Sequence, residues 1–314
     1  MEKRIYLVTG GAGFIGSHLC ERLLREGESV RVLDNFSSGK EENLRDLGGE
    51  VEAINADIRD LRAVKDAMRG VHIVFHEAAL GSVPRSVADP VTTHDTNITG
   101  TLNVLLAARD AGVRRVVYAS SSSVYGETPT LPKHEGITPQ PLSPYALSKL
   151  AGEHYINIFK HVYGFEAVSL RYFNIFGPRQ DPQSEYAAVI PKFVTALLNG
   201  APPTVYGDGQ QSRDFTYVEN VVEANLLASE AEGVAGQFFN VACGGRYTLL
   251  ELLSKIKEIL GSDISPVHEP GRAGDVKDSQ ASIDAAERAL GYRVKVDFEE
   301  GLRRTVAWFK AQPR

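Results

Sequence analysis

A tyrosine and a lysine stand four residues apart in the segment LSPYALSKL, at Tyr145 and Lys149. Positions four apart lie on one face of a helix, so the lysine ammonium can lie near the tyrosine phenol. A nearby positive charge, with the cation of an oxidised nicotinamide beside it, favours the phenolate and lowers a pKa that is normally about 10. Tyr145 is therefore a candidate general base. An isolated pair of this kind is more often a half-buried tyrosine beside a solvated lysine, so the interpretation depends on the rest of the chain.

Four consecutive serines, residues 120–123, follow the apolar run RRVVYA. We expect them at the carboxyl end of a strand, the rim where a cofactor's reactive ring would lie. A serine hydroxyl there can share a proton with Tyr145 and with a substrate alcohol.

The elements that position these residues follow from alternating patterns in the first half of the chain. Short, continuous, β-branched runs predict strands that are buried on both faces. They cover residues 5–10, 29–34, 50–55, 71–79, 114–121 and 166–172. Helical patterns lie between them at 14–26, about 60–69, about 94–111 and 145–163. This rhythm predicts an α/β fold with a Rossmann-type, doubly wound parallel sheet.

After Asn174 the rhythm changes to Gly- and Pro-rich loops, with helices near 186–199, 218–231, 248–260, 282–290 and 298–311. Such a smaller α/β region is expected to lie over the strand ends and to hold a substrate. We assign 1–173 and about 217–235 to the NAD-binding domain, and 174–216 and 236–314 to the substrate-binding domain.

The segment TGGAGFIGSHL follows the first predicted strand and opens the first predicted helix. Gly10, Gly13 and Gly16 allow a tight turn, a close approach of the backbone to a pyrophosphate, and close helix packing. Asp34 ends the next strand about 20 residues on, as in dinucleotide-binding units. The Asp34 carboxylate can accept hydrogen bonds from both hydroxyls of the adenosine ribose, and it would repel a 2′-phosphate. Asp34 therefore favours NAD over NADP. Two cations near the same segment, Lys40 and Arg59, could instead favour the 2′-phosphate of NADP.

Asp57 comes just after the third predicted strand. An acid at this point can meet the adenine amino group. It can equally cap the helix predicted over 58–69.

The bulk properties exclude several classes of function. A formal net charge of −6 argues against a protein that binds nucleic acid or an anionic membrane surface. The two cysteines, Cys20 and Cys243, have no disulfide or zinc spacing, and the eight histidines form no ligand cluster, so no metal is expected. The chain starts without a signal peptide and has no apolar stretch long enough to span a membrane, so we expect a cytoplasmic protein.

The glycine pattern, a serine after the fifth strand and Tyr-x-x-x-Lys together resemble the extended short-chain dehydrogenase/reductases, and most closely the nucleotide-sugar 4-epimerases. The resemblance covers essentially the whole chain. It implies that Ser121, Tyr145 and Lys149 are the catalytic trio and that Asn97, in DTNITGTLNVL, is the active-site asparagine. The NAD contacts implied, besides those already named, are Phe14, Ile15, Asn35, Ile58, Ala78 and Ala79.

The resemblance also implies a UDP-sugar as the substrate. Asn174 corresponds to a diphosphate or sugar contact, and segments 187–191 and 204–207 correspond to those that frame uracil. Arg213 and Arg272 correspond to arginines that bind the diphosphate, and Asp275 to the acid on the uridine ribose. The remaining substrate contacts implied are Ser82, Arg85, Ser122, Ala188, Val189, Val205 and Tyr206.

The residues after Ser121 discriminate between the chemistries that this family performs. Similar proteins that dehydrate or decarboxylate sugars carry acidic residues here, whereas this chain has Ser122 and Ser123, which cannot act as the acid and base of an elimination. The chemistry that remains possible is oxidation of the sugar at carbon 4, followed by return of the hydrogen to the opposite face of the sugar ring. The expected reaction is the 4-epimerisation of UDP-glucose and UDP-galactose through a transient 4-keto sugar.

Sugar choice in similar epimerases depends on a position after the ribose-binding acid, where tyrosine restricts the pocket and a small residue opens it. Ser279 occupies that position, which implies room for the acetamido group of UDP-GlcNAc and UDP-GalNAc. The alternative is a UDP-glucuronate 4-epimerase or decarboxylase, with Arg85 or Arg179 as the cation for the carboxylate. A catalytically silent NAD-binding scaffold is a third possibility, which the catalytic trio disfavours.

A homodimer is also expected from the resemblance. Helices 94–111 and 145–163 pair with their copies in similar proteins to form a four-helix bundle. Ile156, Ile158 and Phe159 suit that interface, and they suit packing within one chain equally well.

Overall fold

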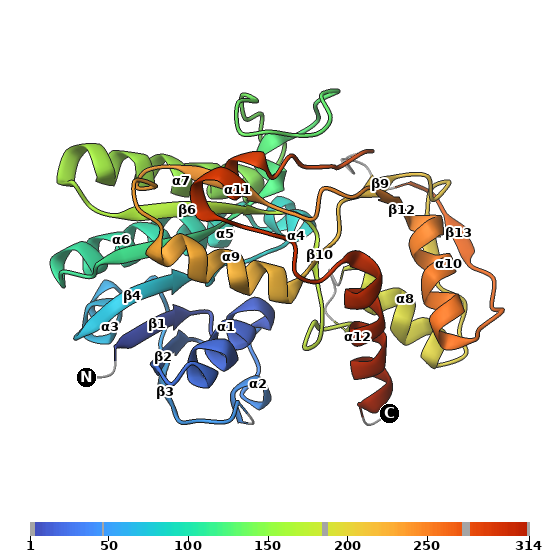
Figure 1. Cartoon of the computed structure of the whole chain (residues 1–314), viewed down its shortest axis with the longest axis horizontal. Helices are drawn as coiled ribbons and strands as arrows, with labels where there is room; N and C mark the ends of the chain where they lie inside the picture. The colour runs from blue at the N-terminus through green and yellow to red at the C-terminus, as the bar shows by residue number, and fades with distance from the viewer. Residues whose placement is uncertain (1–3, 46, 184–187, 272–276, 313–314) are drawn as a thin grey trace.

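The computed structural model describes residues 4–45, 47–183, 188–271 and 277–312. Seven parallel strands form a central sheet in the order β11-β6-β5-β4-β1-β2-β3 (Figure 1). The predicted Rossmann-type fold is confirmed. Because the strand order reverses between β1 and β4, a crevice is expected at their carboxyl ends. The strands are β1 (Ile5–Thr9), β2 (Ser29–Asp34), β3 (Val51–Asn55), β4 (Val71–His76), β5 (Arg115–Ser121), β6 (Ala167–Tyr172) and β11 (Phe238–Val241).

The seventh strand was not among the predicted strands. β11 pairs with β6 at the edge of the sheet, with Phe238 opposite Ser169 and Val241 opposite Tyr172. The prediction that residues 236–314 belong to the substrate-binding region is therefore wrong for this strand. The segment FFNV has only four residues, and its membership in the sheet depends on pairing with a strand far away in the sequence.

Helices cover both faces of the sheet because successive side chains of each buried strand point to opposite faces. On one face, Val8 and Val32 pack with apolar residues of α1, α9 and α11, and on the other Leu7 and Leu33 pack with those of α3, α6 and α7. These helices are α1 (Phe14–Arg25), α3 (Leu61–Ala67), α6 (Gly100–Asp110), α7 (Pro144–Tyr163), α9 (Val218–Glu230) and α11 (Asp284–Leu290), and the short α2 (Glu42–Arg45) follows β2.

The helix predicted over 94–111 is divided into different helical types. Two short helices, α4 (Val83–Ala88) and α5 (Pro90–His94), lead into a π-helical turn at Asp95–Thr99, and α6 follows. Such π turns are rare and frequently mark functional sites. This one carries Asn97.

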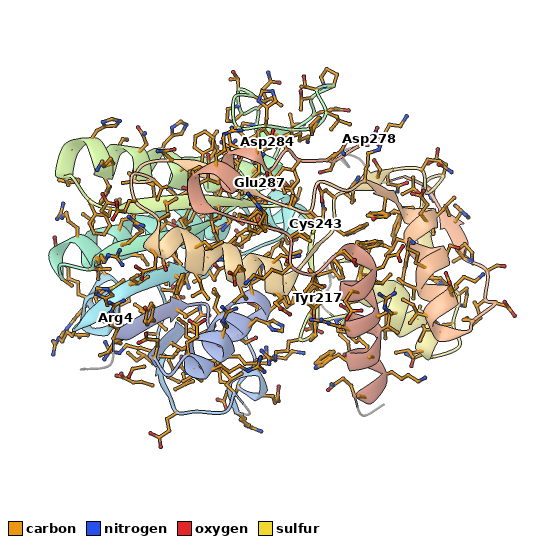
Figure 2. All side chains as sticks on the ribbon, in the orientation of Figure 1. Arg4, Tyr217, Cys243, Asp278, Asp284 and Glu287 are labelled. Atoms are coloured by element: carbon orange, nitrogen blue, oxygen red, sulfur yellow. The ribbon has the colours of Figure 1, made fainter. Side chains whose placement is uncertain are left out.

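A second hydrophobic core lies beside the sheet and joins α8 (Val189–Leu198), α10 (Leu249–Leu260) and α12 (Phe298–Ala311). Figure 1 shows these three helices together at one end of the molecule, and Figure 2 shows Cys243 between them and the sheet. The short strands here form pairs: β7 (Ile175–Phe176) with β10 (Thr216–Tyr217), β8 (Thr204–Tyr206) with β13 (Val267–Glu269), and β9 (Ser212–Arg213) with β12 (Tyr247–Thr248).

Candidate active site

The glycine-rich turn joins β1 to α1 at the carboxyl end of the sheet. Gly10 has a φ of 69°, and a Cβ there would lie 2.7 Å from the backbone nitrogen of Ala78. A Cβ at Gly16 would lie 2.3 Å from the carbonyl oxygen of Gly10. Gly13, which has no side chain, occupies the N-cap position of α1. The turn therefore brings the start of α1 close to the sheet and leaves the backbone N–H groups of the helix start accessible to an anion.

The other predicted contacts of this turn surround it. Phe14 and Ile15 are the first two residues of α1 and pack against the second core. Ala78 and Ala79 follow β4, and the N–H of Ala78 donates to Oγ1 of Thr9 at 3.3 Å.

Asp34 ends β2 with a buried carboxylate. It accepts hydrogen bonds from the N–H groups of Ala12, at 3.0 Å, and Phe36, at 2.8 Å. Burial raises its pKa, and these two N–H groups oppose that rise. The two cations that could have favoured a 2′-phosphate are paired with carboxylates, Lys40 with Asp181 at 3.3 Å and Arg59 with Asp57 at 2.8 Å.

Asp57 does not cap a helix. Asp60 is the N-cap of α3, and its carboxylate accepts from Arg62 and Ala63. Asp57 accepts instead from both the N–H and the side chain of Arg59, and from Nδ2 of Asn35 at 2.8 Å. The side-chain hydrogen bond from Arg59 is the largest of the effects that lower the pKa of Asp57 to about 2.

Ile58, the next residue, lies in the core rather than on the surface. A Cβ at Gly100 would lie 2.6 Å from its Cδ1, so the side chain of Ile58 packs closely against α6.

The catalytic trio predicted from the sequence lies at the carboxyl end of β5 and on the first turns of α7. Ser143 caps α7 by accepting from the N–H of Ala146 at 3.1 Å, and Pro144 occupies the first turn. Nζ of Lys149 donates to the carbonyl oxygen of Ala119 at 2.7 Å and lies 5.9 Å from the centre of the Tyr145 ring. The expectation that the two side chains share one helical face is confirmed.

In the protein without NAD, the pKa of Tyr145 depends on groups other than Lys149. Burial raises the pKa of Tyr145, a hydrogen bond with Ser121 lowers it, and the charge of Glu77 raises it further. Burial also lowers the pKa of Lys149 to about 8. The ammonium is hydrogen-bonded to a backbone carbonyl. That it favours the phenolate together with an oxidised nicotinamide stays a prediction.

Asn97 is buried between two parts of this site. Its Oδ1 accepts from the N–H of Leu80 at 2.8 Å, and its Nδ2 donates to Oγ of Ser148 at 3.0 Å. The π turn thus joins the loop after β4 to the helix that carries Tyr145 and Lys149.

Glu77 was not among the predicted site residues. It follows β4 in the segment HEAA, and its Oε1 accepts from the hydroxyl of Tyr172 at 2.8 Å. Burial raises its pKa to about 7, while the hydrogen bond from Tyr172 and the charge of Lys149 oppose the rise. The signal in the sequence is an acid that directly follows an apolar strand. Its neighbour His76 is buried between Thr9 and Thr101, consistent with a structural role.

A cavity of about 270 Å³ lies in the second half of the chain, between β7, α8, β8 and β9. Val205 lies beneath it, fully buried in the second core, and its side chain does not line the cavity. Five of the predicted substrate residues do line it: Asn174, Ala188, Val189, Tyr206 and Arg213.

Asp214 is a second residue that sequence reasoning missed. Its carboxylate accepts from the N–H groups of Cys243 and Gly244, both at 3.1 Å, and of Ala281 at 3.0 Å. Its carbonyl accepts from Nδ2 of Asn174 at 3.1 Å. Asp214 therefore ties together three segments of the substrate region.

The other predicted substrate residues that the structure describes are not among those lining this cavity. Ser279 is buried, and its N–H donates to the carbonyl of Ser212 at 3.1 Å. Ser82 caps α4 by accepting from the N–H of Arg85, and Ser122 begins the 3₁₀ turn Ser122–Tyr125 after β5. Arg272 and Asp275 lie outside the described residues.

The two arginines considered for a uronate carboxylate differ in their surroundings. Arg179 pairs with Glu21 of α1 and donates to Ser17, so it is used within the protein. Arg85 is exposed on α4.

Two searches of the described residues bear on other classes of site. In that part of the chain no three His, Cys, Asp or Glu residues are grouped as a metal would require. None of the helices described there has the length and apolar character of a membrane span.

Comparison with known proteins gives consistent similarities. The profile of the NAD dependent epimerase/dehydratase family matches residues 6–242. The UDP-glucose 4-epimerase of Mycolicibacterium smegmatis is 40% identical over 309 residues, which cover 97% of this chain and 98% of that protein.

Two solved structures are similar over nearly the full length of both chains. The UDP-N-acetylglucosamine 4-epimerase of Methanobrevibacter ruminantium, in complex with UDP-N-acetylmuramic acid, is 43% identical with a TM-score of 0.94, and the match covers 98% of this chain and 99% of that one. The UDP-glucose 4-epimerase of Thermus thermophilus, in complex with NAD, is 41% identical with a TM-score of 0.90 and the same coverage.

Proposed function

Since the chain belongs to the NAD dependent epimerase/dehydratase family, we propose that it is an NAD-dependent 4-epimerase of UDP-hexoses. Its substrates are UDP-glucose and UDP-galactose, together with UDP-GlcNAc and UDP-GalNAc, and the reaction passes through a transient 4-keto sugar. The observation that carries the proposal is the grouping of Ser121, Tyr145 and Lys149 at the carboxyl end of the sheet, with serines where an elimination needs acids.

The residues of the crevice suit NAD. The turn Gly10–Gly16 offers backbone N–H groups to the pyrophosphate, and Asp34 offers a carboxylate to the adenosine ribose. Asn35 and Asp57 lie together beyond Asp34, where the adenine would be held. Bound NAD supplies the acceptor and donor of the hydrogen at carbon 4.

Proton transfer falls to the protein. Tyr145 takes the proton of the 4-hydroxyl and later returns it, and Ser121 shares a hydrogen bond with the phenol. Lys149, whose pKa lies near 8, provides the positive charge beside them. Asn97 keeps α7 in position against the loop after β4.

The cavity lined by Asn174, Tyr206 and Arg213 receives the UDP part of the substrate. The guanidinium of Arg213 suits the diphosphate, and the aromatic and apolar lining suits uracil. We also assign Arg272 to the diphosphate and Asp275 to the uridine ribose. Asp214 keeps the segments of this cavity together.

Ser279 sets the space for the sugar substituent at carbon 2. We expect Ser279→Tyr to reduce turnover of UDP-GlcNAc by at least about tenfold relative to UDP-glucose, because a tyrosine fills the space of an acetamido group. Initial rates with the two substrates check this. Equal losses for both sugars would contradict a role of Ser279 in selectivity.

We also place the protein in the cytoplasm as a homodimer. Cys20 and Cys243 are both free thiols, as suits a reducing compartment. Exposed apolar side chains gather on α5 and α7, which pack against each other, and these include Val91, Ile158 and Val162. A reversible conversion of UDP-glucose to UDP-galactose would serve galactose metabolism.

A single assay tests the reaction. Purified protein is mixed with UDP-galactose, UDP-GlcNAc or UDP-glucuronate, without added NAD, and the sugar signals are followed by proton NMR. The proposal predicts 4-epimers of the first two. A galacturonate product or carbon dioxide from the third alone would favour the uronate alternative, and no product from any would favour a silent scaffold.

A further inference from the structure

Glu77 is a carboxylate at the carboxyl end of the sheet to which the proposed reaction gives no role. Its N–H donates to the carbonyl of Thr9 at 3.1 Å, and a Cβ at Gly10 would lie 3.0 Å from its carbonyl carbon. Glu77 therefore lies beside the first glycine of the dinucleotide turn.

Two successive hydrogen bonds, from Asn225 to Tyr172 and from Tyr172 to Glu77, hold this carboxylate from β6, the strand on the other side of β5. The hydroxyl of Tyr172 donates to Oε1 of Glu77 at 2.8 Å and accepts from Nδ2 of Asn225 on α9, also at 2.8 Å. Tyr172 lies on β6 directly opposite Ser121 of β5. These hydrogen bonds thus connect the end of β4 to β6 at the level of Ser121, the proposed catalytic serine.

The charge of Glu77 acts on the catalytic residues. It raises the pKa of Lys149, which burial lowers, and so helps to keep the ammonium charged. It also raises the pKa of Tyr145 and of its own partner Tyr172. Glu77 is thus the carboxylate whose charge acts on both catalytic side chains of α7.

We propose that Glu77 is a positioning residue for the redox half of the reaction: its carboxylate, fixed by Tyr172 and Asn225 beside the first glycine of the dinucleotide turn, favours the oxidised form of bound NAD. The inference rests on the proposed function, because it requires NAD in the Gly10–Gly16 turn. Reduction of the nicotinamide adds two electrons and one proton and cancels the positive charge of the ring. The inference places the carboxylate near the ring, where its charge would stabilise the oxidised form and oppose reduction. The bias favours return of the hydrogen to the sugar over loss of the keto sugar.

The test measures reduction of the bound nucleotide by an external hydride donor, and it needs no sugar turnover. Holoenzyme is treated with sodium cyanoborohydride, and the absorbance of the reduced nicotinamide is followed. At about pH 8.5, where most of Glu77 is ionised because its pKa is about 7, we expect Glu77→Gln to be reduced about tenfold faster than the wild type, the size expected from removing one charge interaction near a protein surface.

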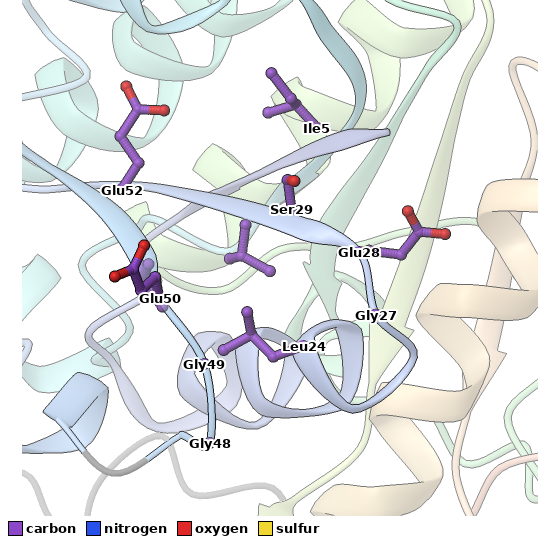
Figure 3. A pocket seen from close by; sticks show the side chains of 11 residues that line it. Ile5, Leu24, Gly27, Glu28, Ser29, Gly48, Gly49, Glu50 and Glu52 are labelled. Atoms are coloured by element: carbon purple, nitrogen blue, oxygen red, sulfur yellow. The ribbon is translucent and has the colours of Figure 1, made fainter. Parts of the chain in front are cut away.

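A matched control removes the same charge at the other end of the sheet. Glu50 is exposed and lines a cavity of about 890 Å³ at the amino ends of β1, β2 and β3, together with Glu28 and Glu52 (Figure 3). Glu50→Gln is expected to be reduced at the wild-type rate. A similar acceleration in Glu50→Gln would show a general effect of net charge and would overturn the inference.

A second variant keeps the test decisive if Glu77→Gln fails to fold or to hold NAD. Tyr172→Phe retains the carboxylate but removes the donor that lowers its pKa, so at about pH 8.5 more of Glu77 is protonated than in the wild type and reduction is severalfold faster. Wild-type reduction rates in each variant that folds and holds NAD would refute the inference. Wild-type protein that holds no NAD or forms no epimer would instead refute the proposed function.

Discussion

At the scale of single residues, the site combines groups whose burial opposes the charges that the chemistry needs. Burial raises the pKa of Tyr145 and lowers that of Lys149. The hydrogen bond with Ser121 lowers the pKa of Tyr145, and the charge of Glu77 raises that of Lys149, but the same charge also raises the pKa of Tyr145. The spacing of Tyr145 and Lys149 predicted their shared face, but it could not predict the burial that opposes their ionisation.

Removing the phenol tests this site most directly. We expect Tyr145→Phe to lower kcat by roughly 10²–10⁴, the range for loss of a general acid–base group, while NAD stays bound. Tyr163→Phe, an exposed position at the end of the same helix, is the matched control and should keep the wild-type rate. The checks are proton NMR for turnover and the nucleotide released on denaturation. A Tyr145→Phe protein with wild-type turnover would contradict the assigned role.

Asp214 gives a prediction for stability against pH. Burial raises the pKa of its carboxyl from 3.8 to about 7, so between these values the folded state binds more protons than the unfolded state. The free energy of unfolding should therefore fall as pH rises from about 4 to about 7, by at most about 1.4 kcal/mol per pH unit from this group. Urea unfolding of Asp214→Asn should lack this part of the slope.

Asp263→Asn, which changes an exposed carboxylate, is the control and should keep the wild-type slope. Parallel pH profiles for the wild type and Asp214→Asn would show that Asp214 does not titrate in this range.

At the scale of elements, most strands and helices could be predicted because apolar runs and helical periods are local signals. The failures have non-local causes. β11 is a four-residue segment that becomes a strand only by pairing with β6. The π turn at Asp95–Thr99 lies within residues 94–111, whose sequence pattern predicts one continuous α-helix. Glu77 and Asp214 are isolated acids whose surroundings come from segments far apart in sequence, so spacing alone could not place them in the site.

The glycine turn is the element whose geometry tolerates least change. A Cβ at Gly16 would lie 2.3 Å from the backbone oxygen of Gly10, so Gly16→Ala forces the turn apart. We expect a loss of about 1–3 kcal/mol in the free energy of unfolding and loss of bound NAD. Gly81→Ala, where a Cβ meets open space, should change stability by no more than about 0.5 kcal/mol. Denaturant unfolding and nucleotide content measure both, and equal effects would contradict the packing argument.

At the scale of the whole molecule, α5 and α7 present exposed apolar side chains among the residues that the structure describes. Val162 is 64% exposed and Val91 67%, whereas Ile156 and Phe159 pack within the chain. Of the three residues considered for a dimer interface, only Ile158 therefore faces outward.

A charge on this face should separate the proposed dimer. We expect a molecular mass of two chains for the wild type by light scattering, and of one chain for the double variant Ile158→Glu and Val162→Glu, because two carboxylates cannot be buried unpaired. Val267→Glu, an exposed apolar position on β13, should leave the mass unchanged. A wild-type mass of one chain would reject the dimer.

The two cores of the molecule also differ in when they can form during synthesis. β1 to β6 follow one another along the chain, so these strands and the glycine turn leave the ribosome before α9 and α11, which cover one face of the sheet. The second core needs Phe298, Leu302, Val306 and Phe309 of α12, the element that follows all the others. A nascent chain would therefore carry the strands and the glycine turn of its nucleotide site before it could complete either core.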